Sequence, residues 1–265
     1  IALHLGIRVE DFAFDEDGVT IAARSPQGRL EERGVALIAA DGLWSNLRQR
    51  LGHRREPRFA RRTAWRALAP ADALMPELRA PAVNLWFGTR AHLVHYPVRS
   101  GTLINVVAIV GDDWREPGWS AAGERAEILA RYRAPMWSAV PRAILAAPEH
   151  WQKWALYDRA PLQSWGRGPV TLLGDAAHPT LPFLAQGASM ALEDAWVLAD
   201  CLARQPLAEA LAGYAAARAP RCSRIVAAAN GNAKIYHLSG LRKTAAHTAL
   251  LKRSMTEPVI GGALL

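Results

Sequence analysis

Several features are scarce in this sequence, and each shortage argues against a class of protein. The only two cysteines, Cys201 and Cys222, form no CxxC pair, so we expect neither a disulfide framework nor a redox pair, and a cytoplasmic, reducing location fits. No set of Cys and His residues has zinc-ligand spacing, so we expect no metal site. No apolar run approaches the roughly 18 residues that a membrane span needs, so we expect no membrane contact.

Lysine is also scarce: only four of the 32 Lys and Arg residues are lysine. The formal net charge is +8, which raises the possibility of a nucleic-acid partner. The arginines are scattered, however, and the densest cluster, at residues 47–62, has no nucleic-acid-binding motif and no aromatic residues arranged for stacking. We therefore expect no nucleic-acid partner.

The pattern of apolar residues predicts a chain of mixed α/β character. The continuous apolar run at 35–40, VALIAA, predicts a strand buried on both faces. Strand-like segments separated by turn signals between residues 58 and 110 predict a mostly antiparallel sheet. The pattern is helical from 189 to about 236, with predicted breaks near Pro206 and at Pro220, and residues 237–265 begin helix-like.

One stretch combines a strand, a carboxylate and a helix start. The segment VTLLGD ends an apolar strand at Gly174 and Asp175, and a helical pattern begins near Gly187. Glycine permits close backbone approach, an ionised Asp accepts hydrogen bonds from hydroxyl groups, and a helix N-terminus favours negative charge. These properties suit a flavin, with its ribityl chain at Asp175 and its ring at the helix start. A strand–turn–helix in which Asp175 is only a cap is an equally good interpretation.

A second motif follows the apolar run at 35–40. The segment AADGLWSNLR places Asp41 and Gly42 in a sharp turn, followed by Ser45 as a candidate N-cap and by Arg48. Asp41 could orient the helix start or contact a nucleotide, and Arg48 could bind a phosphate. Such Asp-Gly turns are common, so this motif alone identifies no ligand.

Together the two motifs resemble those of the class A flavoprotein monooxygenases, FAD enzymes that hydroxylate aromatic rings. The segments AADGLWSNLR and LLGDAAHPTLPFLAQGASMALEDA carry the resemblance, with a β-rich block between them. TAWRALAPAD and HLVHYPVRSGTLINVVAIV are similar to the branch that contains salicylate hydroxylase and 3-hydroxybenzoate 6-hydroxylase. The resemblance covers residues 1–220 and is specific for the family, but it does not specify one substrate.

The sequence departs from the family in two respects. The usual GQG is Ala185-Gln186-Gly187, and a usual Asn is Ser189. The GxGxxG motif of the first βαβ unit, which binds the ADP part of FAD, does not occur, so we expect an N-terminally truncated FAD-binding fold. The expected division is an FAD-binding domain at 1–55 and 155–220, a substrate-binding domain with an antiparallel sheet at 56–154, and a C-terminal helical segment at 221–265.

The resemblance also implies roles for single residues. It places Asp175, after Gly174, at the ribityl chain, Pro182 beside the flavin ring, and the backbone of Gly187, Ala188 and Ser189 at the N1/O2 edge of the ring. It links Asp41 and Arg48 to the pyrophosphate region and to use of the nicotinamide cofactor. For His178 we expect a framework role.

The chemistry implied is reduction of FAD by NADH or NADPH, formation of a flavin C4a-hydroperoxide with O₂, and hydroxylation of a phenolic, salicylate-like acid. Because a phenol must lose its proton, a histidine is the expected base. Family position favours His95, with Gln186 as a second substrate contact, and His92 with Tyr96 lies on the alternative face of the strand. Either histidine could instead be a surface or core residue. A homodimer is also possible.

Two alternatives stay open on the sequence. The chain could be a truncated remnant that cannot hold FAD, or a related flavin monooxygenase that acts on a hydroxynicotinate or an isoprenoid ring.

Overall fold

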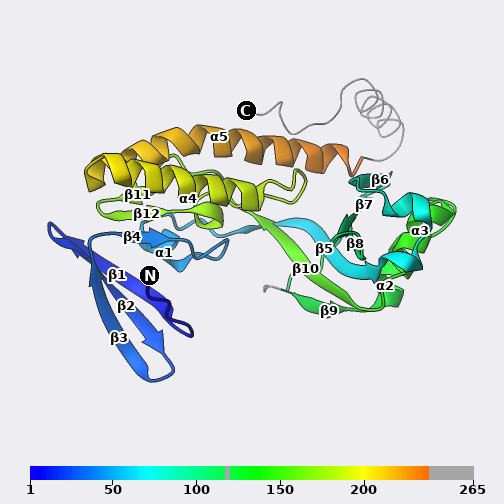
Figure 1. Ribbon diagram of the computed structural model, residues 1–265, viewed down its shortest axis with the longest axis horizontal. Coiled ribbons are helices and arrows are strands. Elements are labelled where there is room, and N and C mark those ends of the chain that lie inside the picture. Colours follow the sequence, from blue (N-terminus) through cyan, green and yellow to red (C-terminus); the bar gives the residue numbers. More distant parts are fainter. Residues whose placement is uncertain (117–119, 239–265) are drawn as a thin grey trace. The chain divides into compact units, whose positions relative to one another are not determined.

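The computed structural model describes residues 1–116 and 120–238 (Figure 1). The described residues divide into two compact units, one formed by 1–58 and 157–230 and the other by those described between 59 and 156 together with 231–238. The helix-like pattern predicted after residue 238, and most of the predicted 221–265 segment, lie outside the described residues. Which unit serves a cofactor and which a substrate remains a prediction. Within the described ranges, no helix is both long and apolar enough to cross a membrane.

The first unit begins with an antiparallel three-stranded sheet, in which β2 lies between β1 and β3. Its strands have the following bounds: β1 (Arg8–Asp15), β2 (Gly18–Ser25) and β3 (Gly28–Gly34). The apolar pattern of the sequence predicts strands at 19–24 and near 29–33, which β2 and β3 confirm, whereas residues 1–12 have too few apolar positions to be classified. β1 contains intermediate and exposed residues and no buried one, so its apolar signal is weak.

A second small sheet of the first unit carries both sequence motifs. It joins β4 (Leu37–Ala39), β11 (Gly166–Arg167) and β12 (Val170–Leu172) in the order β11-β12-β4. β4 and β12 are parallel, so their carboxyl ends meet at one edge. The prediction that the whole run 35–40 is a buried strand was wrong at its start: Val35 is 74% exposed, because it lies in the connection between β3 and β4.

Helices complete the first unit. α1 (Asn46–Arg50) follows β4, a short 3-10 turn, η3 (Gly174–Ala176), follows β12, and the long helices α4 (Gly187–Arg204) and α5 (Leu207–Ile235) run side by side (Figure 1). The core between these elements contains, among others, Leu47, Trp165, Leu172, Met190 and Tyr214.

The predicted helix break at Pro220 was wrong, since α5 continues through this proline. A proline inside a helix costs about 3 kcal/mol, through a lost hydrogen bond and a steric clash. Just beyond Pro220, Cys222, Ile225 and Val226 are buried. Burial of apolar side chains stabilises a helix by about 1.5–3 kcal/mol each, which is enough to offset the proline.

The second unit is built on a six-stranded sheet in the order β6-β7-β8-β5-β10-β9. Neighbours in the series β6-β7-β8-β5 pair antiparallel, which confirms the predicted antiparallel sheet. Its core includes Trp65, Leu93, Ile104, Ile144 and Trp151. The bounds of its elements are β5 (Arg58–Pro70), η1 (Ala71–Ala73), η2 (Pro76–Arg79), β6 (Asn84–Gly88), β7 (Ala91–Val98), β8 (Leu103–Gly111), β9 (Ala121–Gly123), α2 (Arg125–Arg131), α3 (Ala139–Ala146) and β10 (Trp151–Asp158). The mixed α/β fold class predicted from the sequence is confirmed.

Candidate cofactor site

The turn after β12 presents a carboxylate at the surface of the first unit. Gly174 has a φ of +61°, and a Cβ atom at this position would lie 3.2 Å from the Cβ atom of Ala191 on α4. Glycine therefore allows both the left-handed backbone and the close packing of the turn on the helix. The next residue, Asp175, is exposed. The surrounding protein atoms nevertheless raise the pKa of Asp175, an effect that nearby His178 partly opposes.

The start of α4 has no side-chain cap. Gln186 occupies the N-cap position, but its side chain makes no capping hydrogen bond, and the first turn contains no acidic residue. Ala188 and Ser189 in that turn are exposed, as is Pro182 in the preceding loop. The first N–H groups of a helix have no partner within the helix and carry partial positive charge. This helix start can therefore accept an electron-rich group of a ligand.

The Asp-Gly motif forms a capped helix start in the first unit. One carboxylate oxygen of Asp41 accepts from the backbone N–H of Leu47 at 3.1 Å, and Oγ of Ser45 accepts from that of Arg48 at 2.9 Å. Gly42, with a φ of +77°, makes the turn between them. Of the two roles considered for Asp41, the structure shows orientation of the helix start. A contact with a nucleotide remains a prediction.

Arg48 lies in the interior and connects the two motifs. Its side chain donates to three backbone carbonyls: Nη1 to Ala176 at 3.0 Å and to Ala177 at 3.1 Å, and Nη2 to Ala160 at 3.2 Å. Burial, together with nearby Arg159, lowers the pKa of Arg48 to about 10. The guanidinium thus holds the turn that contains Asp175. A contact between Arg48 and a phosphate remains a prediction.

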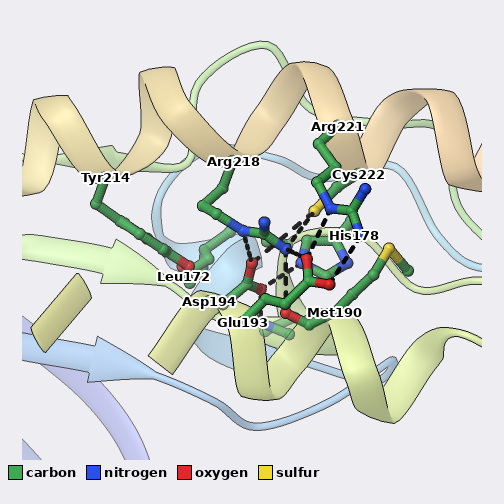
Figure 2. Close-up of polar contacts among 12 residues, drawn as sticks. Leu172, His178, Met190, Glu193, Asp194, Tyr214, Arg218, Arg221 and Cys222 are labelled. Carbon is green, nitrogen blue, oxygen red and sulfur yellow. Dashed lines mark hydrogen bonds and ion pairs between the residues drawn. The ribbon is translucent and has the colours of Figure 1, made fainter. Parts of the chain in front are cut away.

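A buried polar cluster lies beneath this turn, between α4 and α5 (Figure 2). Its centre is Asp194 of α4, which is 0% exposed. One carboxylate oxygen of Asp194 accepts from the backbone N–H of Gly174 at 3.1 Å and from Nε2 of His178, and the other accepts from Nε of Arg218 at 2.7 Å. Arg218 also pairs with Glu193 at 2.7 Å.

The electrostatics of this cluster favour a charged His178. Burial alone would lower the pKa of His178, but the hydrogen bond to Asp194 and the nearby thiol of Cys222 raise it to about 9. His178 therefore belongs to the framework of the turn, as expected. The sequence analysis did not identify Asp194 or Arg218, although an Asp within an otherwise apolar helical face is a signal that could have pointed to a buried partner.

The predicted substrate residues on β7 belong to the second unit. His95 is 0% exposed, and its Nδ1 atom accepts from Nε1 of Trp86 at 3.1 Å. Burial lowers the pKa of His95, so the imidazole is neutral near pH 7, although the carbonyl of Leu78 opposes the shift. His92 on the other face contacts Nε2 of His237 through Nδ1 at 2.8 Å, while Tyr96 is partly exposed.

The predicted site residues are therefore distributed over both units. The first unit contains Asp41, Arg48, Gly174, Asp175, Pro182, Gln186, Gly187, Ala188 and Ser189. His95 and Tyr96 lie in the second unit. A groove of about 1070 Å³ in the first unit, along β11 and α5, is lined by none of these residues.

The residues of the first unit fit the flavin end of FAD. Asp175 supplies an exposed acceptor for ribityl hydroxyl groups, and the start of α4 supplies N–H donors with no side-chain cap. The adenine end is not accounted for by these residues, since the sequence contains no GxGxxG.

Known proteins with similar sequences include hydroxylases of aromatic acids. Residues 2–229 match the family model described as "FAD binding domain". The chain is 37% identical over 238 residues to 3-hydroxybenzoate 6-hydroxylase 2 of Aquipseudomonas alcaligenes, covering 89% of the chain and 72% of that protein. It is 38% identical over 225 residues to 3-amino-4-hydroxybenzoate 2-monooxygenase PtmB3 of Streptomyces platensis, covering 84% of the chain and 55% of that protein.

Solved structures show the same similarity. A salicylate hydroxylase substrate complex has a TM-score of 0.78 and 30% identity, covering 94% of this chain and 66% of that one. Klebsiella pneumoniae HpxO complexed with FAD and uric acid has a TM-score of 0.81 and 30% identity, covering 98% of this chain and 65% of that one. The chain spans between 52% and 72% of the length of the first curated relatives. The chain belongs to the FAD-binding domain family, in the branch of the class A flavin-dependent aromatic monooxygenases.

Proposed function

We propose that this chain is part of an FAD- and NAD(P)H-dependent monooxygenase that hydroxylates a phenolic aromatic acid. The observation that carries the proposal is the pairing of an exposed carboxylate, Asp175, with the uncapped start of α4 on one buried framework. The names of the relatives, which are hydroxylases of hydroxybenzoates, support this substrate class.

The residues that hold the cofactor follow from their chemistry. The carboxylate of Asp175 would accept hydrogen bonds from the ribityl chain, and the backbone N–H groups of Gly187, Ala188 and Ser189 would donate to the electron-rich edge of the ring. Pro182 lines the ring with an apolar surface. When bound, FAD supplies the redox chemistry and the activation of O₂, and NADH or NADPH is the reductant.

His95 remains our choice for the residue that takes the phenolic proton, with Gln186 as a second substrate contact, and Tyr96, which lies on the other face of the strand with His92, stays the alternative. The lowered pKa of His95 keeps the imidazole neutral, as a base must be. Its Nδ1 lone pair accepts from Trp86, so this hydrogen bond must open before Nδ1 can take a proton.

A homodimer and a cytoplasmic location stay predictions.

A heterocyclic substrate is the second candidate. It is favoured by the 30% identity to HpxO, whose structure contains uric acid. A hydroxynicotinate is a heterocycle that carries a hydroxyl and a carboxylate, as a hydroxybenzoate does, and it belongs to the same test.

The proposal is tested by titrating the purified chain with FAD and following flavin fluorescence. NADH consumption and product formation are then measured with 3-hydroxybenzoate, salicylate, a hydroxynicotinate and uric acid. We expect bound flavin and a rate that rises with a hydroxybenzoate. Failure to bind FAD at saturating concentration would show that this chain is a remnant. A response to heterocycles alone would contradict the benzoate assignment.

A further inference from the structure

The position of Asp194 links the two halves of the candidate flavin site. Asp194 lies on α4, five residues after Ser189, so it shares a helix with the turn that faces the flavin ring. Its carboxylate binds the N–H of Gly174 and the ring of His178, which are the two ends of the turn that contains Asp175. A single side chain thus fixes the ribityl-binding carboxylate relative to the helix start.

Two further observations show that this turn is held tightly against α4. A Cβ atom at Gly174 would lie only 3.2 Å from the Cβ atom of Ala191, so the turn packs closely on the helix. On the opposite side, Arg218 of α5 donates to the second oxygen of Asp194, and its terminal nitrogen lies 2.7 Å from Glu193. Figure 2 shows His178 of the turn and Arg218 of α5 beside Asp194.

The carboxylate of Asp194 is the partner that His178 and Arg218 share. His178 faces Asp194 of α4, Cys222 of α5 and Asp175 of its own turn, while the ring of Trp165 packs against it at 5.0 Å between centroids. Arg218 faces Asp194, Glu193 and Cys222. Because buried charges are stable only when paired, loss of the Asp194 carboxylate leaves two cations without their shared partner.

A metal ion is a poorer interpretation of the same cluster. His178, Asp194 and Cys222 offer ligand atoms that lie within 4.8 Å of one another. Both oxygens of Asp194 already accept hydrogen bonds, one of them from the positively charged Arg218, which also lies 3.7 Å from the sulfur of Cys222. A cation at this point would be repelled by the guanidinium.

We propose that Asp194, together with His178, is a positioning residue for FAD that fixes Asp175 relative to the first turn of α4. This inference rests on the proposed function, because it assigns FAD to that site. Asp194 and His178 act through the turn and do not contact the flavin themselves.

The test compares the wild-type chain with Asp194→Asn, with His178→Gln and with the control Asp200→Asn. Asp200 also lies on α4, but it is exposed and pairs with Arg204 at the surface. FAD affinity is measured by flavin fluorescence, and amide hydrogen exchange is measured for the peptide that contains 174–178. We expect Asp194→Asn to weaken FAD binding by about tenfold or more, since hydrogen bonds to a buried charged group are lost. Exchange in this peptide rises, and Asp200→Asn changes neither quantity.

His178→Gln keeps a neutral hydrogen-bond donor at position 178. It is the second test variant if Asp194→Asn does not fold. In the wild type, FAD affinity falls as the pH rises through about 9, where His178 loses its proton. In His178→Gln this fall is absent, a result that a purely structural role would not produce. Unchanged FAD affinity and unchanged exchange in the folded variants would overturn the inference. If the wild type binds no FAD, the proposed function fails. Amide hydrogen exchange in the 174–178 peptide then decides separately whether Asp194 holds the turn in place.

Discussion

Nη1 of Arg48 donates to the carbonyl oxygen of Ala176 at 3.0 Å, although the two residues are 128 positions apart in the sequence. This contact joins the Asp-Gly motif after β4 to the Gly-Asp motif after β12. The two motifs follow parallel, neighbouring strands, so their turns meet at one edge of the sheet. Their joint occurrence in the sequence therefore has a direct physical cause.

Replacing Arg48 should loosen this junction. Arg48→Ala removes hydrogen bonds to three carbonyls and leaves them buried, so we expect the free energy of unfolding to fall by about 3 kcal/mol. Urea denaturation measures the change. The control is Arg50→Ala on the same helix, where an exposed pair with Asp11 at 3.3 Å contributes at most about 0.5 kcal/mol. Equal loss in both variants would contradict the role of Arg48.

Replacing Asp175 should separate stability from cofactor binding. The pKa of Asp175 is raised, so its ionised form is less favourable in the folded chain than in the unfolded chain at neutral pH. Asp175→Asn removes this cost, and we expect stability to stay equal or rise slightly. The variant also loses the charged acceptor for the ribityl chain, so FAD affinity should fall by about tenfold. Thermal unfolding measures the stability and flavin titration measures the FAD affinity of the same samples. A loss of stability that accompanies the loss of FAD affinity would indicate a structural role for Asp175.

The stability of the first unit should depend on pH through His178. Its pKa is about 9 in the folded chain, above the ordinary histidine value of about 6.5. The folded state therefore binds this proton more tightly, and the resulting stability is complete below about pH 6.5 and lost as the pH rises to about 9. The size of the effect is about 3 kcal/mol. Urea unfolding across this window measures it.

His178→Gln is the control for this pH dependence, because glutamine does not titrate. The variant should be less stable than the wild type at about pH 6.5 and should show a flatter profile towards pH 9. An identical slope in both proteins would assign the effect to other groups.

The sequence predicted those parts of the fold and site that depend on local patterns. Apolar runs located β12 and most strands of the second unit, and Asp41, Gly42 and Ser45 fit a local turn and cap. It did not predict that Arg48 would bind three carbonyls, because these partners lie 112 to 129 positions away. Asp194 was missed because its partners also lie outside its own helix: Gly174 and His178 come from the turn after β12, and Arg218 comes from α5. At Pro220, packing of the neighbouring buried residues overrides the local preference of proline.

His95 offers a test of the substrate side of the proposal. We expect His95→Gln to lower kcat for hydroxylation by about 100-fold, which is typical for loss of a general base, with FAD affinity unchanged within about twofold. Trp86→Phe removes the donor to Nδ1 of His95, frees this lone pair, and should shift the pH profile of turnover to higher pH, because the neutral form loses a hydrogen bond. Steady-state kinetics of the FAD-loaded chain and flavin titration give both quantities. The exposed His150 provides the control His150→Gln, which should change neither. Equal losses of turnover and FAD affinity in His95→Gln would show that His95 serves the fold of the second unit instead of the reaction.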